Sequence, residues 1–216
     1  MCFKYGTLFF RKLTKKLKWS IGGEVMDKRE KIMQAATQSF SMFGFKGTTV
    51  DHIAKIAGVG KGTIYTYFEN KEVILQEIIH ALIHEMKENA EKAIKTEQTA
   101  FENLHEVLYS VLLYRKEHVL MIKLSQEVKE FGTEAAKQAL VQIEQELLSY
   151  IQVFIEKAIV NQKFKACNPE ITAFVIYKLY VSLVVDWNDI RHETLTNEEV
   201  FELFKLYLME GLVMVR

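Results

Sequence analysis

Proline and cysteine are both scarce in this sequence, and each shortage narrows the choice of fold. One proline and ten glycines in 216 residues favour long uninterrupted helices over a β fold with many turns. Two cysteines, Cys2 and Cys167, are too few for a disulfide framework or a cysteine metal site, and they are typical of a reducing compartment. We therefore expect an all-α protein, and the length allows either one large domain or two small ones.

Long apolar runs are missing as well. Near the N-terminus only residues 8–10 form an apolar run before further lysines follow, which is too short for a secretory signal. The most hydrophobic stretch, 171–187, is interrupted by Lys178 and Asp186 and is too short to span a bilayer. We expect a soluble, cytoplasmic protein with no membrane partner.

The formal net charge of zero conceals an uneven distribution. Residues 1–25 carry six basic side chains against one acidic, residues 26–72 seven against five, and residues 73–216 fifteen against twenty-two. The basic N-terminal part and the acidic remainder suggest that a polyanion would bind the N-terminal part, although a chance distribution explains the charges alone equally well.

The first 25 residues raise a separate question about where translation starts. Gly22, Gly23, Glu24 and Val25 precede Met26, and their codons can spell a purine-rich ribosome-binding site. We predict that Met26 is the initiator and that residues 1–25 are a basic translated leader. A DNA-contacting arm and an amphipathic membrane-surface segment are the alternatives.

Hydrophobic periodicity and capping residues predict about nine helices. Ile32, Ala36, Phe40 and Phe43 recur at helical spacing and are expected to face inward along the first of them. The predicted ranges are 27–43, 48–57, 60–68, 71–95, 99–116, 118–131, 133–162, 168–192 and 196–215.

The first three predicted helices describe a helix-turn-helix. Two short helices are joined by a tight turn at Gly58 and braced by a longer helix that Gly44 closes. Thr48, with Asp51 three positions on, is expected to form a capping box, and Asn70 is expected to cap the fourth helix.

The third helix is expected to point a polar face away from the core. Gly60 and Gly62 carry no side chains, so the backbone at this helix start can approach a phosphate closely. Lys71 places a cation at a helix start, where the helix dipole opposes it, which suggests a partner outside the protein. Lys61 is the strongest candidate for reading a guanine.

This segment resembles the DNA-binding domain of the TetR/AcrR family over about residues 28–87. The resemblance lies in "FGFKGTTVDHIAKIAGV", in "GKGTIYTYF" and in the "NKE" that opens the fourth helix. The resemblance implies that the third helix lies in the major groove of an operator and that neighbouring residues bind the phosphates on either side. The implied base-reading residues are Lys61, Gly62, Thr63, Tyr65 and Tyr67, and the implied phosphate-binding residues are Thr49 and Lys71. Many relatives have serine where this chain has Gly60, so the hydroxyl contact of that serine is not expected here. His52 and Lys55, on the exposed face of the second helix, are weaker candidates for contacting DNA.

Residues 26–72 are thus expected to form the DNA-binding domain, and residues 73–216 a helical effector-binding and dimerisation domain. The second part contains no enzyme motif, so we expect no enzyme and no cofactor. Glu77, His80 and His84 share one helix face, but such a trio is more often solvated than metal-binding, and no metal is predicted.

The last two predicted helices are apolar almost all round, so each must be covered on every side. The resemblance implies a homodimer interface made by these helices. The predicted interface residues are Phe174, Val181, Val184, Phe201, Phe204 and Leu208.

Other apolar and aromatic residues are candidates for lining a pocket for a small hydrophobic effector, with plain core packing as the alternative for each. They are Phe101, Tyr109, Leu113, Met121, Leu124, Phe131, Tyr150, Phe154, Tyr177 and Trp187.

The expected function is that of a dimeric transcription repressor, which an effector releases from a palindromic double-stranded operator. The two recognition helices would then sit about 34–36 Å apart, one turn of DNA. The alternative is a structural DNA-binding protein that responds to no effector.

Overall fold

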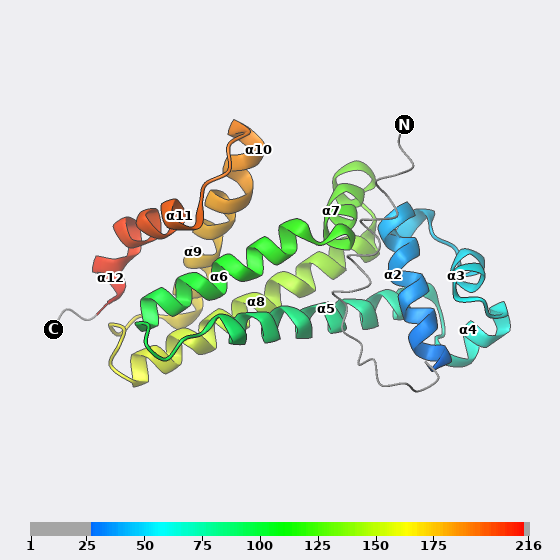
Figure 1. The fold of residues 1–216 in the computed structure, drawn as a ribbon, viewed down its shortest axis with the longest axis horizontal. Helices are drawn as coiled ribbons and strands as arrows, with labels where there is room; N and C mark the ends of the chain where they lie inside the picture. Colours follow the sequence, from blue (N-terminus) through cyan, green and yellow to red (C-terminus); the bar gives the residue numbers. More distant parts are fainter. Residues whose placement is uncertain (1–26, 214–216) are drawn as a thin grey trace.

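The computed structural model describes residues 27–213, and every regular element in that range is a helix (Figure 1). The elements are α2 (Lys28–Gly47), α3 (Val50–Ala57), α4 (Lys61–Tyr67), α5 (Lys71–Ala93), α6 (Ala100–Glu117), α7 (Val119–Phe131), α8 (Glu134–Val160), α9 (Pro169–Val181), η1 (Ser182–Asp186), α10 (Trp187–Arg191), α11 (Asn197–Phe204), η2 (Lys205–Met209) and α12 (Glu210–Leu212). Since α9 runs through η1 into α10, and α11 through η2 into α12, the predicted all-α fold of about nine helices is confirmed. The predictions for residues 1–25, including Cys2, lie outside the described residues.

The core of the N-terminal unit, α2 to α4, forms as the apolar spacing predicts, with one exception. Ile32, Ala36 and Phe40 are fully buried in α2. Phe43 is exposed, so its predicted place in the core is wrong. The chain turns at Gly44, whose φ of 74° breaks the helical path, and Phe45 takes the buried position instead.

The helix-turn-helix is held by capping contacts that differ from the prediction at one position. Thr49, not Thr48, caps α3, and its side-chain oxygen accepts from the backbone N–H of His52. Thr48 is buried and donates its hydroxyl to the Gly44 carbonyl at 2.8 Å. Gly58 ends α3 in the left-handed conformation, as the tight turn required.

Longer helices form the body of the molecule behind this unit. Figure 1 shows α5, α6 and α8 crossing its middle, with α7 beside α2 and with α9 to α12 at the end away from α3 and α4. Asn70 caps α5 by accepting from the N–H of Val73, as predicted. Thr99 and Glu102 form a capping box that starts α6.

A buried carboxylate joins α7 to the last turn of α2, just beyond the kink at Gly44. Glu127 is only 5% exposed, and its oxygens accept from the backbone N–H groups of Phe45 at 2.6 Å and Lys46 at 2.9 Å. A Cβ atom at Gly44 would overlap with Glu127 Oε2, so a glycine is what permits this approach. We call this the Glu127 contact. It fixes the N-terminal unit to the body because a buried carboxylate without its hydrogen bonds is costly.

The last two long helices are not regular along their length. Each predicted helix, 168–192 and 196–215, contains a π-helical segment, η1 and η2 respectively. Such segments widen a helix by one residue per turn and shift the faces that its side chains present. Within the described part of the chain, no helix combines the length and the apolar character needed to cross a membrane.

Two glycine substitutions test the close approach at Gly44. Gly44 and Gly58 both have positive φ, but only at Gly44 would a Cβ meet a neighbour within 4 Å. We expect Gly58→Ala to lower the free energy of unfolding by about 1–2 kcal/mol, the cost of a left-handed alanine. Gly44→Ala should cost more, about 2–4 kcal/mol in total, because it also displaces the buried Glu127 carboxylate. Urea unfolding of both variants measures the difference, and equal losses would contradict the role given to the Glu127 contact.

Candidate DNA-binding surface

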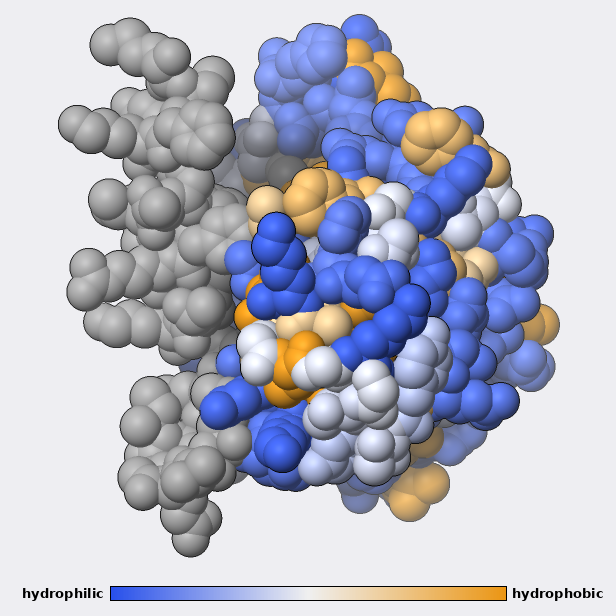
Figure 2. All heavy atoms as spheres, turned by 90° about the vertical axis from the view of Figure 1, so that its right-hand side faces the viewer, coloured by the Kyte–Doolittle hydropathy of each residue, from blue (hydrophilic) through white to orange (hydrophobic). Residues whose placement is uncertain are grey.

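Helices α3 and α4 lie at one end of the molecule and present a largely polar face to solvent. Figure 2 views this end and shows mostly hydrophilic side chains with scattered apolar ones between them. Ile53, Ile64 and Phe68 are buried beneath it, which sets the direction of the two helices. The face that remains is the one on which the sequence predicted contacts with DNA.

The predicted base-reading residues of α4 mostly face outward together. Tyr65 and Tyr67 are exposed, Gly62 is exposed with open space where a Cβ would stand, and Thr63 is half-buried. Gly60 caps α4 without a side-chain hydrogen bond, so the first N–H groups of the helix have no capping side chain. Unpaired N–H groups at a helix start are suited to a phosphate oxygen.

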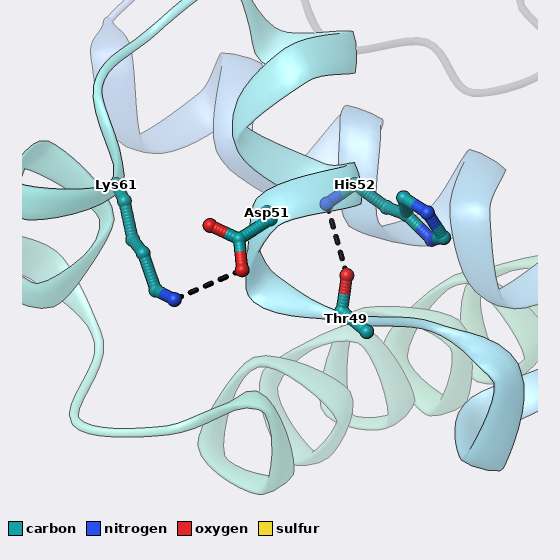
Figure 3. A network of polar contacts seen from close by, with 4 residues as sticks. All are labelled: Thr49, Asp51, His52 and Lys61. Carbon is teal, nitrogen blue, oxygen red and sulfur yellow. Dashed lines mark hydrogen bonds and ion pairs between the residues drawn. The ribbon is translucent and has the colours of Figure 1, made fainter.

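Lys61, the predicted guanine reader, has a partner on α3. Its ammonium group donates to Asp51 Oδ2 at 2.9 Å, and both side chains are exposed (Figure 3). The hydrogen bond with the Asp51 carboxylate raises the pKa of Lys61 above its ordinary value, so the lysine stays charged. Sequence reasoning used Asp51 only as a capping residue and missed this pairing, which requires knowing how the two helices cross.

Thr49 lies at the start of α3 in the same view (Figure 3). Its hydroxyl oxygen accepts from His52 N–H at 3.2 Å, which leaves the hydroxyl proton available to a phosphate. Its predicted phosphate contact therefore stays a prediction that is compatible with its capping role.

Lys71 has internal partners, so the inference that it needs a partner outside the protein is wrong. Its ammonium group donates to the carbonyls of Phe45 at 2.9 Å and Thr48 at 3.1 Å, and it lies 4.3 Å from the centre of the Phe45 ring. These carbonyls belong to the turn between α2 and α3, which explains how a cation is stabilised at a helix start. One of its three N–H donors is not used in these contacts, and its phosphate contact stays a prediction.

The predicted pocket residues do not share one environment. Phe101 is buried and stacks on Phe204, with ring centroids 4.5 Å apart. Phe131 is 60% exposed, lies against the Lys46 ammonium of the N-terminal unit, and lines an open cavity between α2 and α7, so its effector-binding role stays a prediction. Leu113 and Trp187 also face solvent in part. Met121, Leu124 and Tyr177 are buried, and Tyr109, Tyr150 and Phe154 are half-buried against the core, so their pocket role stays a prediction.

A buried polar network connects three helices of the body. His105 on α6 contacts the Tyr180 hydroxyl through Nδ1 and Asn197 Oδ1 through Nε2, the latter at 2.8 Å. Burial lowers the pKa of His105, so it is neutral at physiological pH, with Nε2 donating to Asn197 and Nδ1 accepting from Tyr180. These contacts hold the His105 ring in the core, which is a structural role.

Two of the predicted interface residues are unavailable to a partner. Val184 and Phe204 are buried within one chain, so their assignment to a dimer interface is wrong. Val181, Phe201 and Leu208 are half-buried against the core, whereas Phe174 is exposed. On helices that are apolar all round, sequence alone does not tell which face the chain itself covers. The large apolar residues that remain exposed on the last helices are Ile171, Phe174, Val175, Trp187, Ile190, Leu206, Tyr207 and Met209.

The possible metal trio does not converge. Glu77 forms an ion pair with Arg29 of α2, and His84 Nδ1 lies 3.5 Å from Glu88. Across residues 27–213, no group of three or more histidine, cysteine or acidic side chains is placed to hold a metal ion.

Comparison with known proteins agrees with this geometry. Residues 32–78 match the family described as bacterial regulatory proteins, tetR family. An uncharacterised HTH-type transcriptional regulator of Bacillus subtilis, YhgD, is 44% identical over 187 residues, which are 87% of this chain and 97% of that protein. The fatty acid metabolism regulator protein of the same species is 37% identical over 111 residues, covering 50% of this chain and 57% of its own length.

A solved structure gives the same picture over most of the chain. The crystal structure of the transcriptional regulator FadR from Bacillus subtilis, in complex with stearoyl-CoA, superposes with a TM-score of 0.63 at 26% identity. The match covers 81% of this chain and 96% of that one. The likeness therefore extends through the body and is not confined to the N-terminal unit.

Replacing Gly62 with alanine should separate folding from DNA binding. Nothing lies within 4 Å of the added Cβ, so the variant should fold and its helix should gain up to about 1 kcal/mol from the higher helix propensity of alanine. We expect weaker binding to DNA by about tenfold, the loss of one hydrogen bond to a phosphate that needs close approach. Thermal unfolding and fluorescence anisotropy with labelled duplex measure the two effects.

Gly211→Ala is the matched control, because Gly211 also has open space around it but lies on α12, away from this surface. Since α12 ends the last helix, which is predicted to form the dimer interface, light scattering should first show that this variant keeps the oligomeric state of the parent. It should leave the affinity for DNA unchanged. Unaltered DNA binding by Gly62→Ala would show that the start of α4 does not approach the duplex.

Proposed function

The chain belongs to the TetR family of bacterial regulatory proteins, and we propose that it is a dimeric repressor released from a palindromic operator by a small hydrophobic effector. It is a DNA-binding transcription regulator and not an enzyme. The observation that supports repression by operator binding is the shared outward face of α4, on which Tyr65, Tyr67 and the backbone at Gly62 are exposed together.

The proposed DNA contacts divide into two kinds. Lys61, Tyr65 and Tyr67 would meet base edges in the major groove, where lysine pairs with guanine and aromatic rings contact thymine methyl groups. Thr49 and the N–H groups at the start of α4 would hold phosphates, which position the protein without reading sequence. Lys71 would add one donor to a phosphate while it stabilises the preceding turn.

A homodimer through the last two helices is supported by what those helices leave uncovered. Phe174 and Val175 on α9 and Leu206 and Tyr207 on η2 are exposed apolar side chains, and Leu206 reaches 70% exposure. Exposed apolar patches on a protein of this size mark interaction sites. A second copy of the same helices would cover them with an identical surface around a twofold axis.

The Glu127 contact offers a route from an effector to the DNA-binding surface. Glu127 lies on α7 in the body, and the amides it binds, of Phe45 and Lys46, lie a few residues before Thr49, the cap of α3. A ligand that shifts α7 would therefore move the N-terminal unit with it. In a dimer such a shift changes the spacing of the two α4 helices, which must stay near about 34–36 Å to fit successive major grooves.

The effector proposed for this chain is a molecule with a long apolar part. The related FadR structure contains stearoyl-CoA, and the body of this chain is rich in aromatic and aliphatic side chains around Phe101 and Tyr180. Long-chain acyl-CoA thioesters are accordingly the first compounds to test.

Binding to the DNA upstream of its own gene tests the proposed function. We expect the protein to bind one palindrome there at least about a thousandfold more tightly than a scrambled duplex, with an affinity that falls steeply as salt rises. Stearoyl-CoA should lower the operator affinity by about 5–150-fold, the range of typical allosteric coupling. Fluorescence anisotropy titrations with and without the ligand measure both effects.

Lys61→Ala should weaken operator binding and relax the preference for one base. Equal affinity for the palindrome and the scrambled duplex would favour an effector-independent structural DNA-binding protein. If the protein binds the operator specifically and no hydrophobic compound weakens the complex, the proposed operator binding is supported and the proposed effector is not.

The dimer surface is tested with the double variant Phe174→Glu, Leu206→Glu. Both side chains are exposed in one chain, so the subunit should fold, while two carboxylates per subunit would be buried at the proposed interface at a cost of several kcal/mol each. Light scattering should give about twice the 25.2 kDa chain mass for the parent and one chain mass for the variant. Val160→Glu, at an exposed apolar position on α8, should remain dimeric. A dimeric double variant would place the interface elsewhere.

A further inference from the structure

The two helices of the helix-turn-helix are joined at their first turns by an ion pair on the DNA-facing side. Asp51 is the second residue of α3, Lys61 is the first residue of α4, and the Nζ to Oδ2 distance is 2.9 Å (Figure 3). The Lys61 and Asp51 side chains remain 49% and 66% exposed. The pair therefore stands where a DNA backbone or base edge would arrive.

Stability gives little reason for this pair. Exposed ion pairs contribute little to folding, and a lysine at the start of α4 is opposed by the helix dipole. Asp51, at the start of α3, is favoured by its own helix dipole and is set without reference to Lys61. The pair is therefore expected to matter for DNA binding, through its effect on which DNA groups Lys61 contacts.

A phosphate and a guanine make different demands on a lysine that is already paired. A phosphate is an anion, so it competes with the Asp51 carboxylate for the ammonium group and is repelled by that carboxylate. Guanine O6 and N7 are neutral acceptors, and the ammonium group has three donors. Lys61 can therefore donate to a guanine while it keeps its hydrogen bond to Asp51.

We propose that Asp51 is a specificity-determining residue, which holds Lys61 away from phosphates and so weakens binding to non-operator DNA more than binding to the operator. This inference rests on the proposed DNA-binding function of α4. It predicts that the carboxylate lowers the affinity for random duplex, where Lys61 would otherwise act as one more counterion-releasing charge. On the operator, the hydrogen bond from Lys61 to guanine compensates for the affinity that the Asp51 carboxylate costs.

Asp51→Asn tests the proposal, because asparagine keeps the shape and removes the charge. We expect the affinity for a scrambled duplex to rise by about tenfold, with the slope of log affinity against log salt steeper by about 0.9 per subunit. The affinity for the operator should rise much less, so that the ratio of operator to scrambled affinity falls by about fivefold or more. Anisotropy titrations over a series of salt concentrations measure all three quantities.

Two further variants separate the pair from a simple change of net charge. Glu69→Gln removes an exposed carboxylate from the same unit, just after α4, and should raise both affinities alike, with the ratio unchanged. In a Lys61→Met background, Asp51→Asn should likewise leave the ratio unchanged, since no lysine remains to be released. Circular dichroism melts of each variant show whether it is folded before its affinities are compared.

Two outcomes would overturn the proposal. An unchanged ratio in Asp51→Asn would mean that Asp51 acts only through net charge. A loss of operator affinity with unchanged scrambled affinity would mean that Asp51 itself contacts a base. If the parent chain prefers no operator at all, the proposed function fails instead, and the salt slope on random duplex still reports whether Asp51 competes with phosphate for Lys61.

Discussion

The buried carboxylate of Glu127 is the interaction on which the arrangement of the whole molecule depends. A charge with 5% exposure is tolerated only because two backbone N–H groups, of Phe45 and Lys46, donate to it. Those groups are accessible because Gly44 has no side chain and turns the chain at positive φ. The orientation of the N-terminal unit on the body thus follows from one carboxylate, two amides and one glycine.

The turn that carries these amides is held from its other side as well. Lys71, at the start of α5, donates to the carbonyls of Phe45 and Thr48, and Thr48 donates to the carbonyl of Gly44. The N–H and C=O groups of Phe45 are therefore bound by Glu127 of α7 and by Lys71 of α5 respectively. Because α3 begins directly after this turn, its position is coupled to both α5 and α7.

Much of this fold could be predicted from the sequence, because its signals are local. Gly58 ends the short helix α3 through its left-handed conformation, Asn70 caps the start of the long helix α5, and both act as expected. That Thr49 and not Thr48 caps α3 could not be predicted, since two adjacent threonines carry the same hydroxyl group. The choice is made by Ser39 and the Gly44 carbonyl, which hold Thr48 in the interior.

The errors at the candidate sites have a different origin, which is tertiary packing. Phe174 lies on α9, whose sequence is apolar almost all round and does not set its orientation, and it is exposed. Phe204 lies on α11, whose glutamates face solvent, and it is buried on the opposite side. Phe131 lies apart from the other predicted pocket residues, because α7 ends against the N-terminal unit, where the Lys46 ammonium lies over its ring. Asp51 and Glu127 were missed because a carboxylate on a helix usually faces solvent. Only the crossing of two helices brings each to its partner.

Burial divides the polar contacts of the N-terminal unit into two groups with different consequences. The Glu127 contact is buried, so losing either side leaves an unpaired group in the interior, and the two parts must move together. The Lys61–Asp51 pair and the Thr49 cap are exposed, where water or a phosphate can replace a partner at little cost. Under the proposed function, movement of the body would therefore reach α3 through contacts that do not exchange, while recognition would use contacts that do. A regulator needs both permanent contacts and replaceable ones, and in this chain both kinds occur between Gly44 and Lys61.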